Sequence, residues 1–232
     1  MAWLKESIKK TIGHATLRIA HSYYLGRHLK ADYTKALKWY YKAARFGNED
    51  AMVQIGWMYK SGQGVEQDYK EAMQWYKKAS SRGNGSAMFY IGNLYYSGHG
   101  VIQSYHEAIK WYKKSAEKGF IDAMYILGQL YLLGKGVPIN YPEAIDWHTR
   151  AAQQDNSDSM EVLGTMYYDV TGNNKDYVQA VYWYQKAAEL GNSYAMFGLY
   201  EIYKSGGYGV EADPERAELW LNRFSNIRAE GE

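Results

Sequence analysis

Apolar and aromatic side chains recur along this chain at a spacing of 36 residues. One ladder consists of Trp3, Trp39, Trp75, Trp111, Trp147 and Trp183. Two further ladders with the same step are Met52, Met88, Met124, Met160, Met196 and Tyr23, Tyr59, Tyr95, Tyr131, Tyr167, Tyr203. Since independent ladders stay in register over most of the chain, the sequence predicts tandem copies of one structural unit.

Each unit alternates between a helical face and a turn. In the second unit, residues at i, i+4, i+7 and i+8 predict one apolar helix face: Ala51, Ile55, Met58 and Tyr59. A turn follows at residues 61–65, where Gly62 can take the left-handed conformation that ends a helix. A second apolar face is formed by Ala72, Trp75, Tyr76 and Ala79. Gly56 is the small residue that lets a neighbouring helix approach closely.

The start of the second helix is marked by a capping side chain in every unit. These N-cap residues are Asp32, Asp68, Ser104, Asn140, Asp176 and Asp213. In four units a residue three positions later predicts a capping box: Glu71, Glu107, Glu143 and Gln179. Each N-cap contributes about 1 kcal/mol to helix stability, so the pattern fixes where these helices begin.

The repeats predict a single solenoid domain over residues 1–232. Residues 1–14 match only the second helix of a unit and are expected to form an N-terminal capping helix. The repeats then run over about 15–50, 51–86, 87–122, 123–158, 159–194 and 195–223, and residues 224–232 form a polar tail. The loops at 27–29 and 171–174 depart from the pattern, as do Asp155 and Tyr200, which stand at glycine positions.

The string from Ala51 to Ala79 resembles the Sel-one-like repeat (SLR) family, a relative of the tetratricopeptide repeats. It reads Ala-x-x-x-Ile-Gly-x-x-Tyr-x-x-Gly-x-Gly-Val-x-x-Asp-Tyr-x-x-Ala-x-x-Trp-Tyr-x-Lys-Ala, and the resemblance covers about residues 1–223. It implies an all-α, right-handed superhelical α-solenoid of helix–turn–helix repeats, with first helices lining a concave face. It also implies scaffold or adaptor roles, and some bacterial relatives are immunity proteins that neutralise secreted toxins.

The same analogy places a partner-binding surface on the first helices. The predicted binding residues vary between repeats while the ladder residues do not: Val53, Trp57, Lys60, Phe89, Asn93, Tyr96, Tyr125, Gln129, Leu132, Glu161, Tyr168, Phe197 and Glu201. Aromatic side chains with polar neighbours are typical of binding hot spots. Packing of these rings against neighbouring repeats is the alternative interpretation.

Composition excludes several kinds of chemistry. The chain has 232 residues, a net charge of +2 and no Cys, which rules out disulfides and thiol catalysis. No apolar run is long enough to cross a membrane, and no signal peptide is recognisable. A cytoplasmic location is therefore the default expectation, with a periplasmic or secreted location open if a leader was removed.

No residue pattern indicates a catalytic, cofactor or metal site. The Gly-x-Gly turns lack a following Gly-Lys-Ser/Thr and end helices instead, and the six His form no ligand motif. A basic row on the second helices could follow a phosphate backbone: Lys42, Lys78, Lys114, Arg150 and Lys186. Its place near helix C-termini, where cations interact favourably with the helix dipole, is the simpler explanation.

The sequence therefore predicts a non-enzymatic scaffold or adaptor that binds a protein or peptide partner through the concave face. We expect no nucleic-acid binding, no membrane insertion, and a monomer or weak homodimer. The alternatives are a bacterial immunity or inhibitor protein that blocks a toxin enzyme, and a hydrolase.

Overall fold

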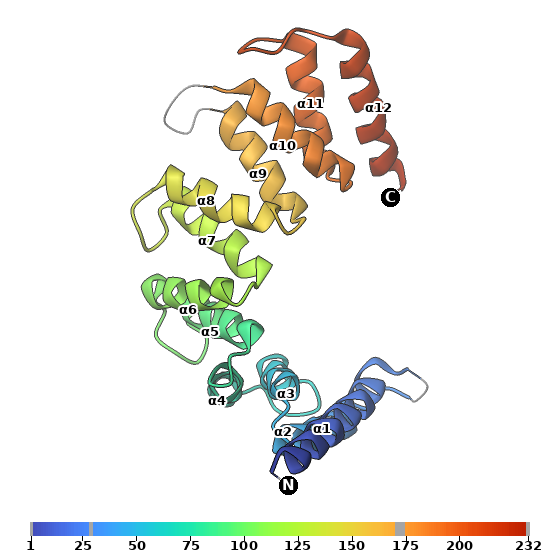
Figure 1. Ribbon diagram of the computed structural model, residues 1–232, viewed down its shortest axis with the longest axis vertical. Coiled ribbons are helices and arrows are strands. Elements are labelled where there is room, and N and C mark those ends of the chain that lie inside the picture. The colour runs from blue at the N-terminus through green and yellow to red at the C-terminus, as the bar shows by residue number, and fades with distance from the viewer. Residues whose placement is uncertain (1, 28–29, 170–174, 231–232) are drawn as a thin grey trace. The chain divides into compact units, whose positions relative to one another are not determined.

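The computed structural model describes residues 2–27, 30–169 and 175–230. This part of the chain forms helices joined by short turns, with no strand beyond one isolated bridge (Figure 1). The helices are α1 (Ala2–Leu25), α2 (Tyr33–Arg45), α3 (Glu49–Ser61), α4 (Tyr69–Ser80), α5 (Gly85–Ser97), α6 (Tyr105–Glu117), α7 (Ile121–Leu133), α8 (Tyr141–Ala152), α9 (Ser157–Tyr168), α10 (Tyr177–Glu189), α11 (Ser193–Ser205) and α12 (Pro214–Glu230). The predicted all-α solenoid of helix–turn–helix repeats is confirmed.

The chain divides into two compact units, residues 1–120 and 121–232. Unit 1 holds α1 to α6 and unit 2 holds α7 to α12, and within each unit every helix packs against the next in chain order. Odd-numbered helices are the first helices of the repeats and even-numbered helices are the second. The prediction of one solenoid domain over the whole chain stays a prediction.

The second helices begin at the predicted N-caps. The Asp68 carboxylate, for example, accepts hydrogen bonds from the backbone N–H groups of Lys70 (2.8 Å) and Glu71 (3.0 Å). The reciprocal half of the predicted capping box is wrong, because the Asp68 N–H donates to the Tyr59 carbonyl at 2.9 Å. The Glu71 carboxylate instead accepts from the Trp75 indole N–H at 2.8 Å. In the other described repeats, the backbone N–H of the N-cap residue likewise donates to the carbonyl of the Tyr in the 36-residue ladder.

The first helices have caps of their own, which the sequence analysis overlooked. Asn side chains accept from the backbone N–H three residues ahead at the start of α3, α5, α9 and α11: Asn48, Asn84, Asn156 and Asn192. The Asn84 amide also donates to the Asp50 carboxylate of the preceding repeat at 3.1 Å. The Asn84 cap therefore connects successive repeats as well as beginning a helix.

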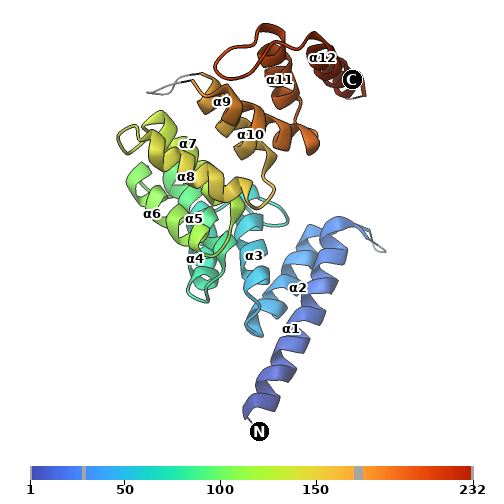
Figure 2. The same cartoon turned by 45° about the horizontal axis from the view of Figure 1, so that its top comes forward.

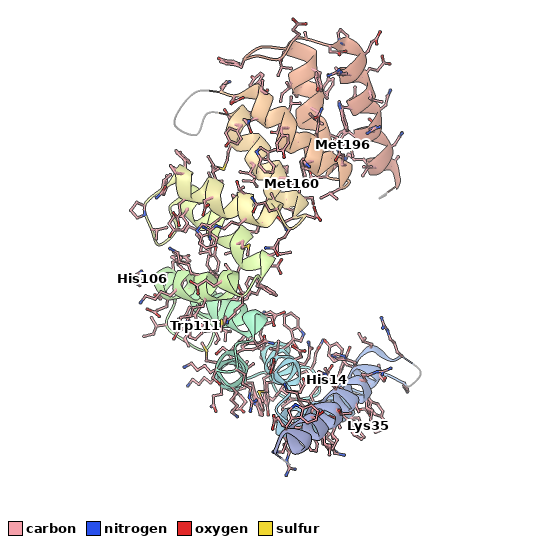
Figure 3. The ribbon with its side chains drawn as sticks, viewed as in Figure 1. His14, Lys35, His106, Trp111, Met160 and Met196 are labelled. Carbon is pink, nitrogen blue, oxygen red and sulfur yellow. The ribbon has the colours of Figure 1, made fainter. Side chains whose placement is uncertain are left out.

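Close approach between the two helices of a repeat requires glycine, as predicted for Gly56. A Cβ at Gly92 would lie 2.6 Å from the ring of Tyr112, which is 1% exposed. Around these contacts lie the buried Ala, Met and Leu ladders, including Met160 and Met196 in unit 2 (Figure 3). The Met ladder is thus core packing, in agreement with its periodicity.

The expected N-terminal capping helix is not separate. Residues 2–25 form one continuous helix, whose N-terminal part extends beyond α2 (Figure 2). In other repeats a Gly-Asn pair such as Gly47-Asn48 ends one helix and caps the next, whereas the equivalent positions here are Thr11 and Ile12. Without such a pair the helix continues, and Gly13 lies inside it.

The C-terminal segment also differs from expectation. The polar tail expected from residue 224 is helical to Glu230, because the Phe224 ring packs on Phe197 with ring centroids 5.5 Å apart. The turn from Ser205 to Asp213 is one residue longer than the equivalent turn from Ser61 to Asp68, and within it Gly207 and Val210 bond to each other's backbone. Residues 28–29 and 171–174 of the two unusual loops lie outside the described residues. None of the described helices is long and apolar enough to cross a membrane.

Candidate first-helix binding surfaces

The predicted binding residues lie on the first helices, divided between the two units. Unit 1 holds those of α3 and α5, and unit 2 holds those of α7, α9 and α11. The predicted aromatic centre is divided in the same way, with Tyr125 in unit 2 and Trp57, Phe89 and Tyr96 in unit 1.

Trp57 forms part of an aromatic cluster in unit 1. Its ring is half-buried, 5.7 Å from Tyr90, and the Lys60 ammonium lies 4.7 Å from the Trp57 ring centroid. Tyr90 in turn stacks on Tyr76 at 5.1 Å. Val53 is only 5% exposed and belongs to the core. Of the three predicted residues on α3, Trp57 and Lys60 therefore present surface to a partner.

Phe89 and Asn93 contact the second helix of their own repeat. The Phe89 ring lies 5.7 Å from Tyr112 and 5.0 Å from Phe120. The Tyr112 hydroxyl donates to the Asn93 side-chain oxygen at 2.7 Å, and burial raises the pKa of that hydroxyl well above its usual range. Both side chains are half-buried, so each combines internal packing with an exposed edge.

Tyr96 continues the cluster along α5. Its ring lies 5.1 Å from Tyr105 of α6, and the side chain is half-buried. Tyr90, which touches both Trp57 and Phe89, was absent from the predicted set. Its position holds Gln54 and Ile126 in neighbouring repeats, so variation between repeats was the signal that could have found it.

In unit 2, Tyr125 packs edge-on against a buried histidine. The ring centroids of Tyr125 and His148 are 5.6 Å apart, and the His148 Nδ1 lies 3.3 Å from the Ser159 hydroxyl. Burial lowers the pKa of His148 to about 4, so its ring is neutral at pH 7. The pKa of Tyr125 is raised, mainly by burial and further by Asp158, and a hydrogen bond with Gln129 opposes this.

The Glu161 side chain is half-buried on the first helix α9. Burial raises its pKa, while the Thr165 hydroxyl donates to it at 2.9 Å and lowers that pKa. The Thr165 hydroxyl also lies 3.0 Å from the Tyr184 hydroxyl. An open cavity of about 200 Å³ adjoins this network, lined by Leu132, Glu161, Val162, Thr165, Met166 and Asp169. Two predicted residues, Leu132 and Glu161, thus meet at one depression.

The remaining predicted residues lie on the later part of unit 2. Tyr168 stacks on Tyr177 with centroids 4.9 Å apart. Phe197 is 43% exposed although it contacts Phe224, and Glu201 is half-buried. The rings predicted to bind a partner therefore all touch neighbouring side chains, and Phe197 keeps the largest exposed fraction of them.

Metal-ligating side chains do not gather in the described part of these surfaces. Within the residues that the structure describes, no cluster of three or more His, Asp or Glu could hold a metal ion. His14 is exposed, and His21 packs on Tyr40 at 5.5 Å with a pKa that burial lowers. What the first-helix surfaces offer is half-exposed aromatic area edged by single charges, which suits recognition of a polypeptide.

Comparison with known proteins identifies the repeat. The Sel1 repeat family model matches six times, at residues 13–48, 49–84, 85–120, 121–156, 157–192 and 193–226. A Sel1 repeat protein from Oxalobacter formigenes is 34% identical, with a TM-score of 0.79 over 92% of this chain and 87% of that one. No curated protein matches the chain significantly.

Two further solved structures share the fold. A protective antigen of uropathogenic Escherichia coli with an SLR fold is 30% identical, with a TM-score of 0.80 over 92% of this chain and 46% of that one. An immunity protein from Pseudomonas aeruginosa is 21% identical, with a TM-score of 0.54 over 94% of this chain and 82% of that one. At this identity the second likeness is one of fold alone.

Proposed function

Since the chain belongs to the Sel1 repeat family, we propose that it is a scaffold or adaptor whose first helices bind a protein or peptide partner. Proteins of this family generally mediate protein–protein interaction and are typically not enzymes. The observation that carries the proposal is the partly exposed aromatic cluster of α3 and α5 in unit 1. Trp57 and Phe89 keep an accessible edge there, beside the Lys60 ammonium.

Aromatic rings that are held in place but incompletely covered suit a binding hot spot. Their positions are fixed by neighbours such as Tyr90 and Phe120, so little side-chain entropy is lost when a partner covers them. Covering their remaining apolar surface contributes about 25 cal/mol per Å². The adjacent Lys60 supplies a charge that can pair with a partner carboxylate.

The test is affinity capture from native lysate with Trp57→Ala and a matched control. Tyr182→Ala removes a ring that is 48% exposed on a second helix, α10. We expect the wild type and Tyr182→Ala to capture the same partner and Trp57→Ala to lose it. Loss of the half-buried indole and of its contact with Tyr90 costs about 2–3 kcal/mol, so the melting temperature of each protein is measured beside its capture. Equal capture by all three, or a large fall in melting temperature with capture unchanged, contradicts the assignment.

A narrower version of the proposal is a toxin-neutralising immunity protein. The shared fold with the Pseudomonas aeruginosa immunity protein supports only the scaffold on which such a role could be built. One-to-one binding of a toxin enzyme, with loss of that enzyme's activity, selects this version. Binding of several peptides without inhibition selects the adaptor, and turnover of a substrate by the pure protein supports the hydrolase alternative instead.

A further inference from the structure

Cations are concentrated on the second helices of unit 1. Helices α2, α4 and α6 carry four, three and three Lys or Arg, against none, one and two Asp or Glu. The equivalent helices of unit 2, α8, α10 and α12, carry one, one and three, against two, one and three. The packing role is the same in both units and the charge is not, so packing does not require the basic residues.

Several of these cations stack on the Trp ladder. The Lys42 ammonium lies 4.0 Å from the Trp39 ring centroid and the Lys78 ammonium 3.8 Å from that of Trp75. The ring of Tyr41 meets the ring of Trp75 at 5.4 Å, so the stacks of α2 and α4 form a continuous surface. The contacts hold each lysine stem in one orientation while the ammonium stays exposed.

Apart from the Trp rings, these ammonium groups have no carboxylate partner among the described residues. In the part of the chain that the structure describes, neither Lys42 nor Lys78 lies in an ion pair. The nearest acid on α4, Glu71, already accepts the indole N–H of Trp75. Oriented cations without a carboxylate lose little conformational freedom when an anion binds them.

An open depression lies at the α2 end of this surface. Its volume is about 370 Å³, and its lining is more apolar than polar, with two aromatic side chains and a surround of four basic ones: Trp39, Tyr41, Lys35, Lys38, Lys42 and Arg45. Lys35 is paired with Asp32 at 3.2 Å, whereas Lys38 and Arg45 are exposed. Figure 3 marks Lys35 on α2. An apolar floor with a basic rim fits an apolar side chain flanked by carboxylates.

We propose that the second-helix surface of α2 and α4 binds an acidic segment of a partner protein. An apolar side chain of that segment fills the depression beside Trp39 and Tyr41, without stacking on the ring face that Lys42 covers, and its carboxylates pair with Lys38, Lys42 and Lys78. This basic surface is distinct from the first-helix cluster around Trp57, so the chain carries two binding surfaces in unit 1.

The same contacts favour a polypeptide over other anionic partners. Single-stranded nucleic acid binds by stacking bases on aromatic faces, and the faces of Trp39 and Trp75 are already covered by Lys42 and Lys78. Helices that lie in a membrane bury an exposed apolar face, and among the described side chains of α2 and α4 only Tyr33, at the start of α2, is an exposed large hydrophobic residue. A carboxylate-bearing segment needs neither feature.

The test measures binding of a fluorescent short peptide in which Glu residues flank a central Phe, using the full chain. The variant is Lys42→Gln with Lys78→Gln, and the matched control is Lys186→Gln, at the equivalent position of α10 in unit 2. We expect the wild type and Lys186→Gln to bind alike and the double variant to bind about tenfold more weakly. A peptide with Gln in place of Glu should not bind, and added salt should weaken the complex.

Several results overturn the proposal. One is equal peptide affinity for the double variant and Lys186→Gln, or equal affinity for the Glu and Gln peptides. Another is tighter binding of a DNA duplex or of phosphatidylserine vesicles than of the peptide, with the same dependence on Lys42 and Lys78. The last is salt-sensitive self-association in sedimentation that these substitutions abolish, because a second copy is then the occupant. All three assays leave the first-helix surface intact and so do not bear on the proposed function.

Discussion

Acidification should destabilise unit 2 through His148, which is 0% exposed. The sequence repeat has Tyr at this position in four of the other repeats, at Tyr40, Tyr76, Tyr112 and Tyr184. Its neighbours in the structure are the Tyr125 ring and the Ser159 hydroxyl, neither of which stabilises an imidazolium charge strongly. Burial alone therefore lowers the pKa of His148 to about 4.

The sign and size of the effect follow from that pKa. In the unfolded chain the imidazole titrates near 6.5, so between that pH and about 4 the unfolded state binds more protons than the folded state. The contribution of neutral His148 to the free energy of unfolding is complete above pH 6.5 and is lost as the pH falls toward 4. The full shift corresponds to about 3 kcal/mol, and at pH 5 about 2 kcal/mol of it is already lost.

The measurement is urea unfolding of the wild type and of His148→Tyr with Ser159→Ala, at neutral pH and near pH 5. The double variant restores the residues of the other repeats and removes the buried base. Its loss of stability on acidification should be smaller than that of the wild type by about 2 kcal/mol. His106→Tyr, at an exposed position (Figure 3), is the matched control and should change nothing. An equal loss in wild type and double variant refutes the role of His148.

Two further predictions concern glycine positions, and both are read by chemical unfolding. Gly92→Ala should destabilise unit 1 by about 2 kcal/mol, since its Cβ would overlap the buried Tyr112 ring. Gly13→Ala, whose Cβ would meet Phe46 at an ordinary 3.4 Å, should be neutral or stabilising by up to about 1 kcal/mol. A larger loss of stability for Gly13→Ala than for Gly92→Ala contradicts the argument that helices approach closely at Gly92. Asp155 has a φ of +59°, so Asp155→Gly should stabilise unit 2 by up to about 1 kcal/mol, and a loss of stability would show that the carboxylate is needed there.

The fold was predictable because its determinants are local and repeated. The N-cap at Asp68 and the left-handed cap at Gly62, with a φ of +70°, depend on backbone geometry within a few residues. The capping box at Glu71 was mispredicted because the Asp68 N–H is taken by the carbonyl of Tyr59, a contact that residue spacing does not reveal. Likewise, α1 continues because Thr11 replaces the helix-ending glycine.

The candidate surfaces were less predictable because they depend on which rings meet across helices. Analogy with related repeats placed Trp57 and Phe89 on the first helices, but not the contact of both with Tyr90. His148 stands where most other repeats have Tyr, and Ser159 stands where the other repeats have Ala. These two departures occur in different repeats, and only the structure shows that the His148 and Ser159 side chains lie side by side. In the same way, the basic row was visible in the sequence, while its stacking on the Trp ladder was not.

Amide hydrogen exchange of the chain, with and without its captured partner, shows whether a partner protein binds the first helices. Such binding should slow exchange in α3 and α5, where Trp57 and Phe89 lie, and leave α10 unchanged. Slowed exchange confined to second helices, or no difference anywhere in a stoichiometric complex, would contradict it.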